Sequence, residues 1–322
     1  MRTATNGWIP RRTIAAVGVL IGVVFAGALG GCVWDPAPFR EAKAITAPAP
    51  AANAPLVVET RNGNVSVERA PVNELKVSGE VRAQTQERAR DAQVTVSNRA
   101  DGAVVVSVQW PEGEARNGEG ATLNVQVPTA WGNAGATVRT NNGSIRLAKL
   151  GGPADIRTSN GAVEVSDHDG TVTARSSNGS ITLDFVEGAV DAETSNGRIT
   201  VTDAAGPVRT ATSNGRVRVV LTGDNAGPVD VRTSNGAVTV LVGQAFAGEL
   251  SVSTSNGSIT LDEALGGAAK VVDKSRRSAK VRFGTEGSPA AASTVKTSNG
   301  SVQIGPAPKD TRGNAVGGGQ GS

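Results

Sequence analysis

Residues 172–201 read VTARSSNGSITLDFVEGAVDAETSNGRITV, and this stretch contains one short unit twice. In the first copy, Val172 and Ala174 alternate with polar residues before a Ser-Asn-Gly turn, and Ile181 and Leu183 alternate after it. Period-two alternation is typical of a strand with one buried and one wet face. We therefore expect each unit to contain two short strands and two turns.

The Asn-Gly turn recurs eight times, mostly within Thr-Ser-Asn-Gly, at intervals of 18, 18, 18, 18, 21, 21 and 43 residues. A near-constant interval of this size predicts a repeat architecture, which we place at residues 134–305. The last interval is about twice the one before it, which predicts a unit that has lost its signature. The asparagines are Asn142, Asn160, Asn178, Asn196, Asn214, Asn235, Asn256 and Asn299.

The two turns of a unit differ in their tolerance of length. The Asn-Gly turn keeps its length, whereas the other turn is longer at residues 222–227 and 242–248, which accounts for the 21-residue intervals. Asn and Gly both tolerate positive φ, which predicts tight type I′ turns. If the units stack, like residues form ladders about 4.7–4.9 Å apart, and asparagines can hydrogen-bond along the stack.

Two all-β architectures fit this pattern. In a two-sheet β-solenoid each unit is one coil of 18–21 residues, and in an up-and-down β-meander each unit is a hairpin. We favour the solenoid because like-on-like stacking explains the repeated Thr-Ser before each turn. With only 3% aromatic residues and 41 glycines, the composition suits short strands and tight turns better than helices.

The flanking segments have other compositions. We interpret residues 1–31 as a signal peptide, residues 32–55 as an Ala/Pro-rich tether, and residues 306–322 as a disordered Gly-rich tail. Residues 56–133 contain less regular strands, and we expect an irregular N-terminal β region that caps the stack, because terminal units of repeat proteins are atypical.

The N-terminus has the features of an export signal. Arg2, Arg11 and Arg12 precede an uncharged apolar run at residues 14–29, which is short for a bilayer span of about 20 residues. Leu29-Gly30-Gly31-Cys32 resembles the lipobox of bacterial lipoproteins, which implies cleavage before Cys32 and its lipidation. An ordinary signal peptide or a single anchor helix is the alternative. In a diderm host, Val33 after the lipidated residue favours an outer-membrane anchor, on the periplasmic or the surface face.

Charge argues against a nucleic-acid partner. Removal of the three signal arginines leaves 32 − 3 = 29 Lys and Arg against 29 Asp and Glu. A side-chain charge near zero lacks the electrostatic footprint of a nucleic-acid-binding protein.

The lipobox-like start, the Val125-Gln126-Val127-Pro128 strand end and the Ser-Asn-Gly-x-Ile-x-Leu/Val units together resemble the bacterial "putative adhesin" β-strand-repeat domain, also called the toastrack domain. The resemblance covers residues 56–305. It implies an envelope-associated all-β repeat domain, and it carries over no catalytic residue because the family has no established common set.

Two features are candidate sites. Six cations cluster where the repeat signature is missing, and they form a candidate patch for anionic ligands or, alternatively, a solvated face at the stack end. His168, in Asp167-His168-Asp169-Gly170, is expected in a solvent-exposed turn, without partners for a metal site. The six cations are Lys270, Lys274, Arg276, Arg277, Lys280 and Arg282.

We expect no catalytic residues, no metal, no cofactor and no enzyme activity, because the sequence contains no His-based triad, phosphate loop or paired metal-ligand motif. The leading expectation is a lipid-anchored envelope protein whose β-repeat surface binds or adheres to a polysaccharide, lipid or protein. Alternatives are a structural or stress-sensing component that binds one partner protein and, third, a carbohydrate-active enzyme.

Overall fold

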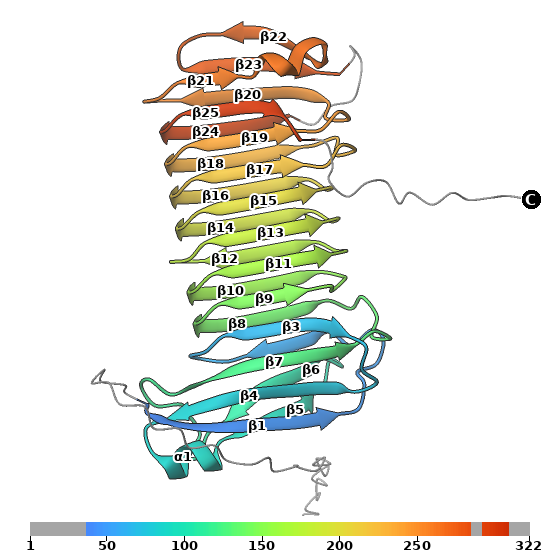
Figure 1. Ribbon diagram of the computed structural model, residues 1–322, viewed down its shortest axis with the longest axis vertical. Coiled ribbons are helices and arrows are strands. Elements are labelled where there is room, and N and C mark those ends of the chain that lie inside the picture. The colour runs from blue at the N-terminus through green and yellow to red at the C-terminus, as the bar shows by residue number, and fades with distance from the viewer. Residues whose placement is uncertain (1–36, 285–291, 309–322) are drawn as a thin grey trace, which may run out of the picture.

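The computed structural model describes residues 37–284 and 292–308. These residues form 25 strands, one α-helix and one 3-10 helix in an elongated stack (Figure 1). The strands make two sheets that run the length of the stack, a 12-stranded sheet, called sheet A here, and a 13-stranded sheet, called sheet B.

Nine coils build the stack. Each coil has one strand in sheet B, a turn at the Asn-Gly edge, and one strand in sheet A. In spatial order the coils are β2 (Leu56–Glu59) with β3 (Val65–Ala70), β8 (Ala136–Asn142) with β9 (Ile145–Ala148), β10 (Ala154–Asn160) with β11 (Val163–His168), β12 (Val172–Ser176) with β13 (Ile181–Val186), β14 (Val190–Asn196) with β15 (Ile199–Ala204), β16 (Val208–Asn214) with β17 (Val217–Leu221), β18 (Val229–Asn235) with β19 (Val238–Val242), β24 (Ser293–Asn299) with β25 (Val302–Pro306), and β20 (Gly248–Thr254) with β21 (Ile259–Leu261).

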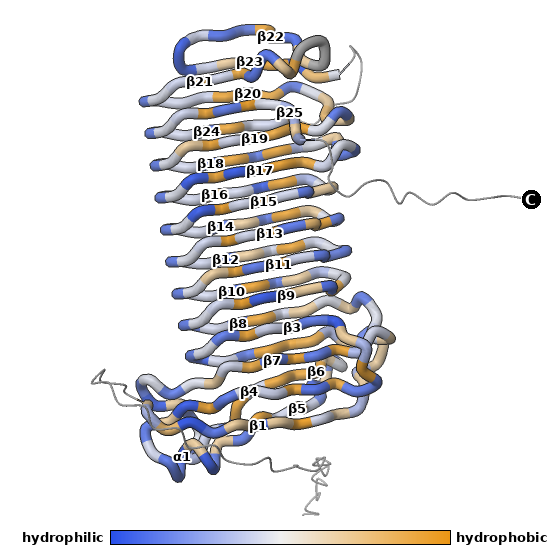
Figure 2. Tube along the Cα trace, in the orientation of Figure 1, coloured by the Kyte–Doolittle hydropathy of each residue, from blue (hydrophilic) through white to orange (hydrophobic). Residues whose placement is uncertain are grey.

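Parallel pairing confirms the solenoid over the meander. β14 pairs with β16 with Val190 opposite Val208, and β15 pairs with β17 with Ile199 opposite Val217. The apolar residue of each alternation faces the interior, where like residues of successive coils lie on one another. The tube in Figure 2 accordingly alternates apolar and polar residues along the strands and is polar at the Asn-Gly edge.

The stack has an excursion of the chain near its N-terminal end and coils out of sequence order at its C-terminal end. The Asn62 coil, which precedes a long excursion in the chain, lies directly against the Asn142 coil through β2–β8 and β3–β9 pairing. The Asn299 coil inserts between the Asn235 and Asn256 coils (Figure 1). Asn62-Gly63, a copy of the Asn-Gly turn that precedes the eight repeat copies in the chain, is therefore the first Asn-Gly corner of the stack.

The long last interval does not contain a lost repeat, which corrects our expectation. Residues 263–283 form the 3-10 helix η1 (Glu263–Ala268) and the antiparallel hairpin β22 (Ala269–Lys274) and β23 (Ser278–Phe283). β23 pairs with β20 and occupies the outer edge of the Asn256 coil in sheet B. The Asn299 coil, which comes last in the chain, can therefore join the Asn256 coil only on its inner side.

The N-terminal cap is formed by β4 (Leu75–Ala83), α1 (Gln86–Asp91), β5 (Gln93–Asn98), β6 (Val104–Gln109) and β7 (Gly120–Pro128). A further strand, β1 (Phe39–Ala47), pairs antiparallel with β4 over its whole length. This pairing corrects the predicted tether, because nine of its residues belong to sheet A. β1 lies at the sheet edge, where it pairs with β4, and only Ile45 and Ala47 at its end pack against the core.

The Asn-Gly turns are corners between the two sheets, and the prediction of type I′ geometry is wrong. None of the eight repeat asparagines or their following glycines has positive φ. Positive φ instead occurs at the opposite edge, at Lys149, Asp167, Phe185 and Asp203, once in each of four successive coils. Glycine follows each asparagine for a different reason, the close approach of the backbone of the preceding coil in the stack.

Candidate functional site

Three residues of the Thr-Ser-Asn-Gly motif each make a specific contact with the neighbouring coil. Thr194 is buried, and its hydroxyl donates to the Gly179 carbonyl of the preceding coil over 3.0 Å. Asn196 Nδ2 donates to Asn178 Oδ1 over 2.9 Å. A Cβ added at Gly197 would lie 2.0 Å from the Gly179 oxygen. The serine is the remaining letter, and its side chain faces solvent.

The asparagines form one continuous ladder. Eight amide hydrogen bonds of 2.6–3.0 Å join nine side chains, each Nδ2 donating to the Oδ1 of the neighbouring coil. The bonds follow the spatial order of the coils, so the ladder passes from Asn235 to Asn299 and then to Asn256. The ladder uses the amide groups within the protein, which makes these residues structural.

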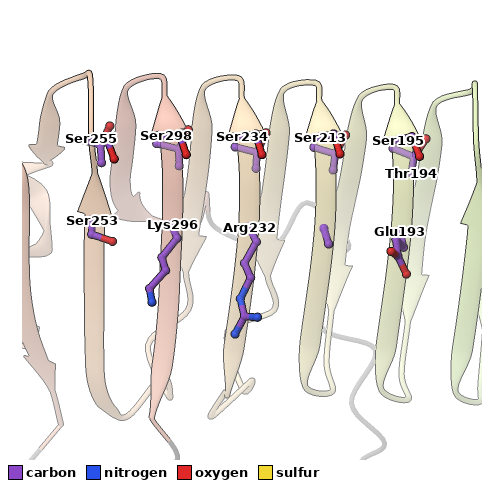
Figure 3. A pocket seen from close by; sticks show the side chains of 15 residues that line it. Glu193, Thr194, Ser195, Ser213, Arg232, Ser234, Ser253, Ser255, Lys296 and Ser298 are labelled. Atoms are coloured by element: carbon purple, nitrogen blue, oxygen red, sulfur yellow. The ribbon is translucent and has the colours of Figure 1, made fainter.

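The serines line a groove on the outer face of sheet B, which we call the serine groove. It has a volume of about 440 Å³ and crosses five coils. Ser195, Ser213, Ser234, Ser298 and Ser255 follow one another along it, at the same level in each coil (Figure 3). All five are exposed, and none of their hydroxyls hydrogen-bonds to another residue within the described ranges.

Charged side chains lie beside the serine row. Arg232 and Lys296 project from adjacent coils, and Glu193 lies two coils away from Arg232, across the coil that carries Ala211 (Figure 3). Arg232 is bound to Asp230 of its own strand over 3.1 Å, whereas Lys296 makes no ion pair with any described residue. The groove thus offers a row of free hydroxyls flanked by charged side chains of both signs, suited to binding a polar, extended ligand.

The six cations predicted as a patch all lie exposed on the β22–β23 hairpin at the end of the stack. Lys280 and Arg282 share Glu249 as a partner, over 2.8 and 3.7 Å. The Lys280 hydrogen bond is the main cause of the lowered pKa of Glu249. The hairpin borders the end of the serine groove, because β23 pairs with β20 and Thr254 N donates to the Arg277 carbonyl over 2.9 Å. The lipidation candidate Cys32 and most of the predicted tail lie outside the described residues.

A buried ion pair in the cap was missed by sequence reasoning. Arg88 of α1 forms two hydrogen bonds of 2.8 Å with the Glu119 carboxylate, which is fully buried. Burial alone would raise the pKa of Glu119, but Arg88 and the backbone N–H groups of Arg116 and Gln84 lower it to about 2. The pair joins α1 to the segment before β7 and has a structural role.

The expectation of an exposed His168 is wrong. Its side chain is 1% exposed and occupies the interior column of Leu150 and Val186. Its Nε2 donates to the Gly152 carbonyl over 2.9 Å, leaving Nδ1 without a partner. Burial lowers the pKa of His168, so the ring is neutral at pH 7. No group of three or more His, Cys, Asp or Glu side chains with metal-binding geometry occurs within residues 37–284 and 292–308.

Comparison with known proteins finds one family model and several solved structures that are similar to this chain. Residues 170–306 match the family model described as a domain of unknown function, DUF7330. The chain is similar to bacterial proteins described as putative adhesins. This agrees with the resemblance to putative adhesins expected from the repeats, whereas the lipoprotein part of that expectation stays a prediction. No curated protein matches the chain.

Two solved structures illustrate the likeness. A putative adhesin from Bacteroides fragilis aligns with a TM-score of 0.44 at 11% identity, covering 84% of this chain and 98% of that one. A putative adhesin from Parabacteroides distasonis aligns with a TM-score of 0.30 at 13% identity, covering 82% and 96%. Alignments of this quality carry no argument about ligands. Within the described ranges, no helix is long and apolar enough to cross a membrane.

Proposed function

We propose that this protein is a lipid-anchored component of the bacterial cell envelope that binds polysaccharide along the serine groove. The observation that supports the binding role is the row of five exposed serine hydroxyls without partners among the described residues. The neighbouring threonine and asparagine side chains of the same coils are engaged within the stack. The serines are therefore the polar groups left for a ligand.

A polysaccharide fits the groove better than a small molecule. Like groups recur at about 4.8 Å along a parallel stack, so the hydroxyls form a regular row rather than a closed pocket. A chain of sugar rings also presents hydroxyls at regular intervals, and hydrogen bonds can form at successive coils. The outer face between the serine row and the cations is polar, which suits sugar hydroxyls and their bridging waters.

The proposed anchor is Cys32, supported by the charged, apolar and small-residue order of residues 1–32. Several acyl chains would hold the protein stably at a membrane, where one chain binds only marginally. We propose the outer membrane as the location. Cys32→Ser should abolish incorporation of a labelled fatty acid and release the protein from the membrane fraction. Retention of the label would exclude Cys32 as the lipidated residue.

Binding is tested with an array of purified envelope polysaccharides. Ser213→Ala with Ser234→Ala removes two hydroxyls at the centre of the groove, and Ser159→Ala with Ser177→Ala removes two from the same row outside it. We expect at least a tenfold loss of affinity for the first pair and less than twofold for the second. Equal affinities would contradict the proposal, and capture of one stoichiometric envelope protein would support a partner-binding component instead.

A further inference from the structure

The arginines of the stack fall into two groups. Most of those on the flat faces are paired with a carboxylate, as Arg157 is with Asp155 over 3.1 Å and Arg175 with Asp191 over 3.0 Å. In two successive coils, those of Asn196 and Asn214, four exposed arginines make no ion pair or hydrogen bond with any described residue. These are Arg198, Arg209, Arg216 and Arg218.

Three of the four lie together where the chain enters sheet A: Arg198 and Arg216 directly precede β15 and β17, and Arg218 lies in β17. Arg198 and Arg216 are neighbours in register, because Ile199 N donates to the Arg216 carbonyl over 3.0 Å and Ile199 lies opposite Val217. Such neighbours are about 4.8 Å apart, and Arg218 follows two residues along the same face, about 6.6 Å farther. We call Arg198, Arg216 and Arg218 the arginine triad.

No carboxylate occupies the flanking positions of the triad. The residues in register on either side of Arg198 and Arg216 are Ser180 and Ala237, and those on either side of Arg218 are Thr200 and Thr239. Like charges at adjacent ladder positions destabilise a sheet. The three guanidinium groups of the triad therefore repel one another without a carboxylate in register, which destabilises the fold. Arginines elsewhere on the stack, such as Arg157 and Arg175, are paired with carboxylates.

We propose that the arginine triad binds the acidic groups of a polysaccharide. Guanidinium groups present planar forks that match carboxylate, sulfate or phosphate oxygens in pairs. Arg198 and Arg216 directly follow Gly197 and Gly215, so they flank the Asn ladder on the side opposite Ser195 and Ser213. A polymer bound in the serine groove reaches the triad around this edge, and the proposal rests on the polysaccharide-binding function proposed above.

A membrane surface is the less suitable source of the anion. The large apolar residues exposed within the described ranges are Phe39, Val271 and Val272, which lie on β1 and β22 at the two ends of the stack. The triad lies on a middle coil pair without an apolar residue to insert beside a lipid headgroup. An extended acidic polymer can contact a flat polar face, and the triad presents guanidinium groups from two successive coils to it.

The test measures binding of the full-length protein in detergent to dextran sulfate, polygalacturonate, neutral dextran and phosphatidylglycerol vesicles. The variant Arg216→Ser with Arg218→Ser is compared with Arg276→Ser and Arg277→Ser, two exposed arginines of the hairpin turn. Both double variants lower the net charge by two. We expect the triad variant to lose at least tenfold in affinity for at least one acidic polymer. The hairpin variant should lose less than twofold in affinity for the same polymer.

Three outcomes would overturn the proposal: equal losses in the two double variants, no binding to either acidic polymer, or a triad-dependent interaction with vesicles alone. Arg216→Ser should also leave the midpoint of thermal unfolding unchanged or raise it, because it removes a like-charge neighbour. A marked fall in the midpoint would indicate a structural role and contradict the assignment. If the triad variant fails to bind acidic polymer while the groove serine variants bind normally, the serine groove is not the binding site. The assignment of the arginine triad is then retained.

Discussion

Substitution of Gly197 by alanine probes the contact that fixes the spacing of the coils. A Cβ at this position would lie 2.0 Å from the Gly179 oxygen, and ordinary contact begins at 3.4 Å. The two coils must therefore separate by about 1.4 Å at this corner. Because the Asn214 coil packs against the other side of the Asn196 coil, the Asn196 coil cannot simply move outward into solvent.

The displacement breaks hydrogen bonds whose number can be read from the structure. The backbone bonds Asn196 N to Ser177 O and Ile181 N to Arg198 O are both 2.9 Å and flank the corner. The Thr194 hydroxyl and the Asn196 amide also bond across it. Four bonds at about 1 kcal/mol each give about 4 kcal/mol. The reduced entropy of the unfolded chain returns about 0.4–1 kcal/mol, so the expected net loss is about 3 kcal/mol.

Two control variants sharpen the measurement, which is equilibrium guanidinium unfolding followed by far-UV circular dichroism. Gly223→Ala has no atom within 4 Å of its new Cβ and no positive φ, so it should be neutral or stabilise slightly. Gly257→Ala meets the Gly300 oxygen at 2.0 Å, but in the Asn256 coil, which has no further coil beyond it, only the β22–β23 hairpin in sheet B, so its cost should be smaller. A Gly197→Ala protein as stable as Gly223→Ala would refute the reasoning.

Further predictions concern buried polar groups. Thr210→Val should raise the free energy of unfolding by about 1–2 kcal/mol in a denaturant titration, because the Thr210 hydroxyl is buried without a partner; a loss of stability would show that the hydroxyl is satisfied. Glu119→Gln should cost about 3–5 kcal/mol by leaving Arg88 unpaired. The contribution of Glu119 should be present above pH 4.5 and lost as the pH falls toward 2, since its folded pKa lies below the unfolded value; a variant with an unchanged acid-unfolding curve would contradict this. His168 is the only histidine, and its lowered pKa means that stability is present above about pH 6.5 and lost at lower pH as the unfolded chain takes up the proton first. His168→Leu should flatten the pH dependence of the unfolding midpoint below about pH 6.5, and an unaltered slope would contradict the assignment.

Alternation and period predicted the coils because both are local properties of the chain. Ile181 and Leu183 are buried as their spacing indicates, and the asparagines form the ladder expected from stacking. The order of the coils was not predictable in the same way. Every coil carries the same signature, so nothing in the Asn299 unit specifies that it joins the Asn235 coil.

Features that depend on distant partners also escaped the sequence. Arg88 and Glu119 are 31 residues apart, in segments without a repeat or motif. β1 lacks an apolar alternation, and its pairing with β4 is made by the backbone. His168 could have been placed by period, because it lies 18 residues from both Leu150 and Val186, but the polar residues around it resemble an exposed turn. The serine row could be predicted from the repeat. That the triad arginines are unpaired could not, because this depends on where every nearby carboxylate lies in the fold.

The most direct test of the stack is disulfide formation between paired cysteines in a chain carrying Cys32→Ser. Neighbouring coils place equivalent residues about 4.8 Å apart, within reach of a disulfide, and alternate coils place them about 9.6 Å apart, beyond reach. The inserted last coil predicts that Ser234→Cys with Ser298→Cys cross-links, and that Ser298→Cys with Ser255→Cys does so too. Efficient cross-linking of Ser234→Cys with Ser255→Cys would mean that the coils follow sequence order and would contradict the fold.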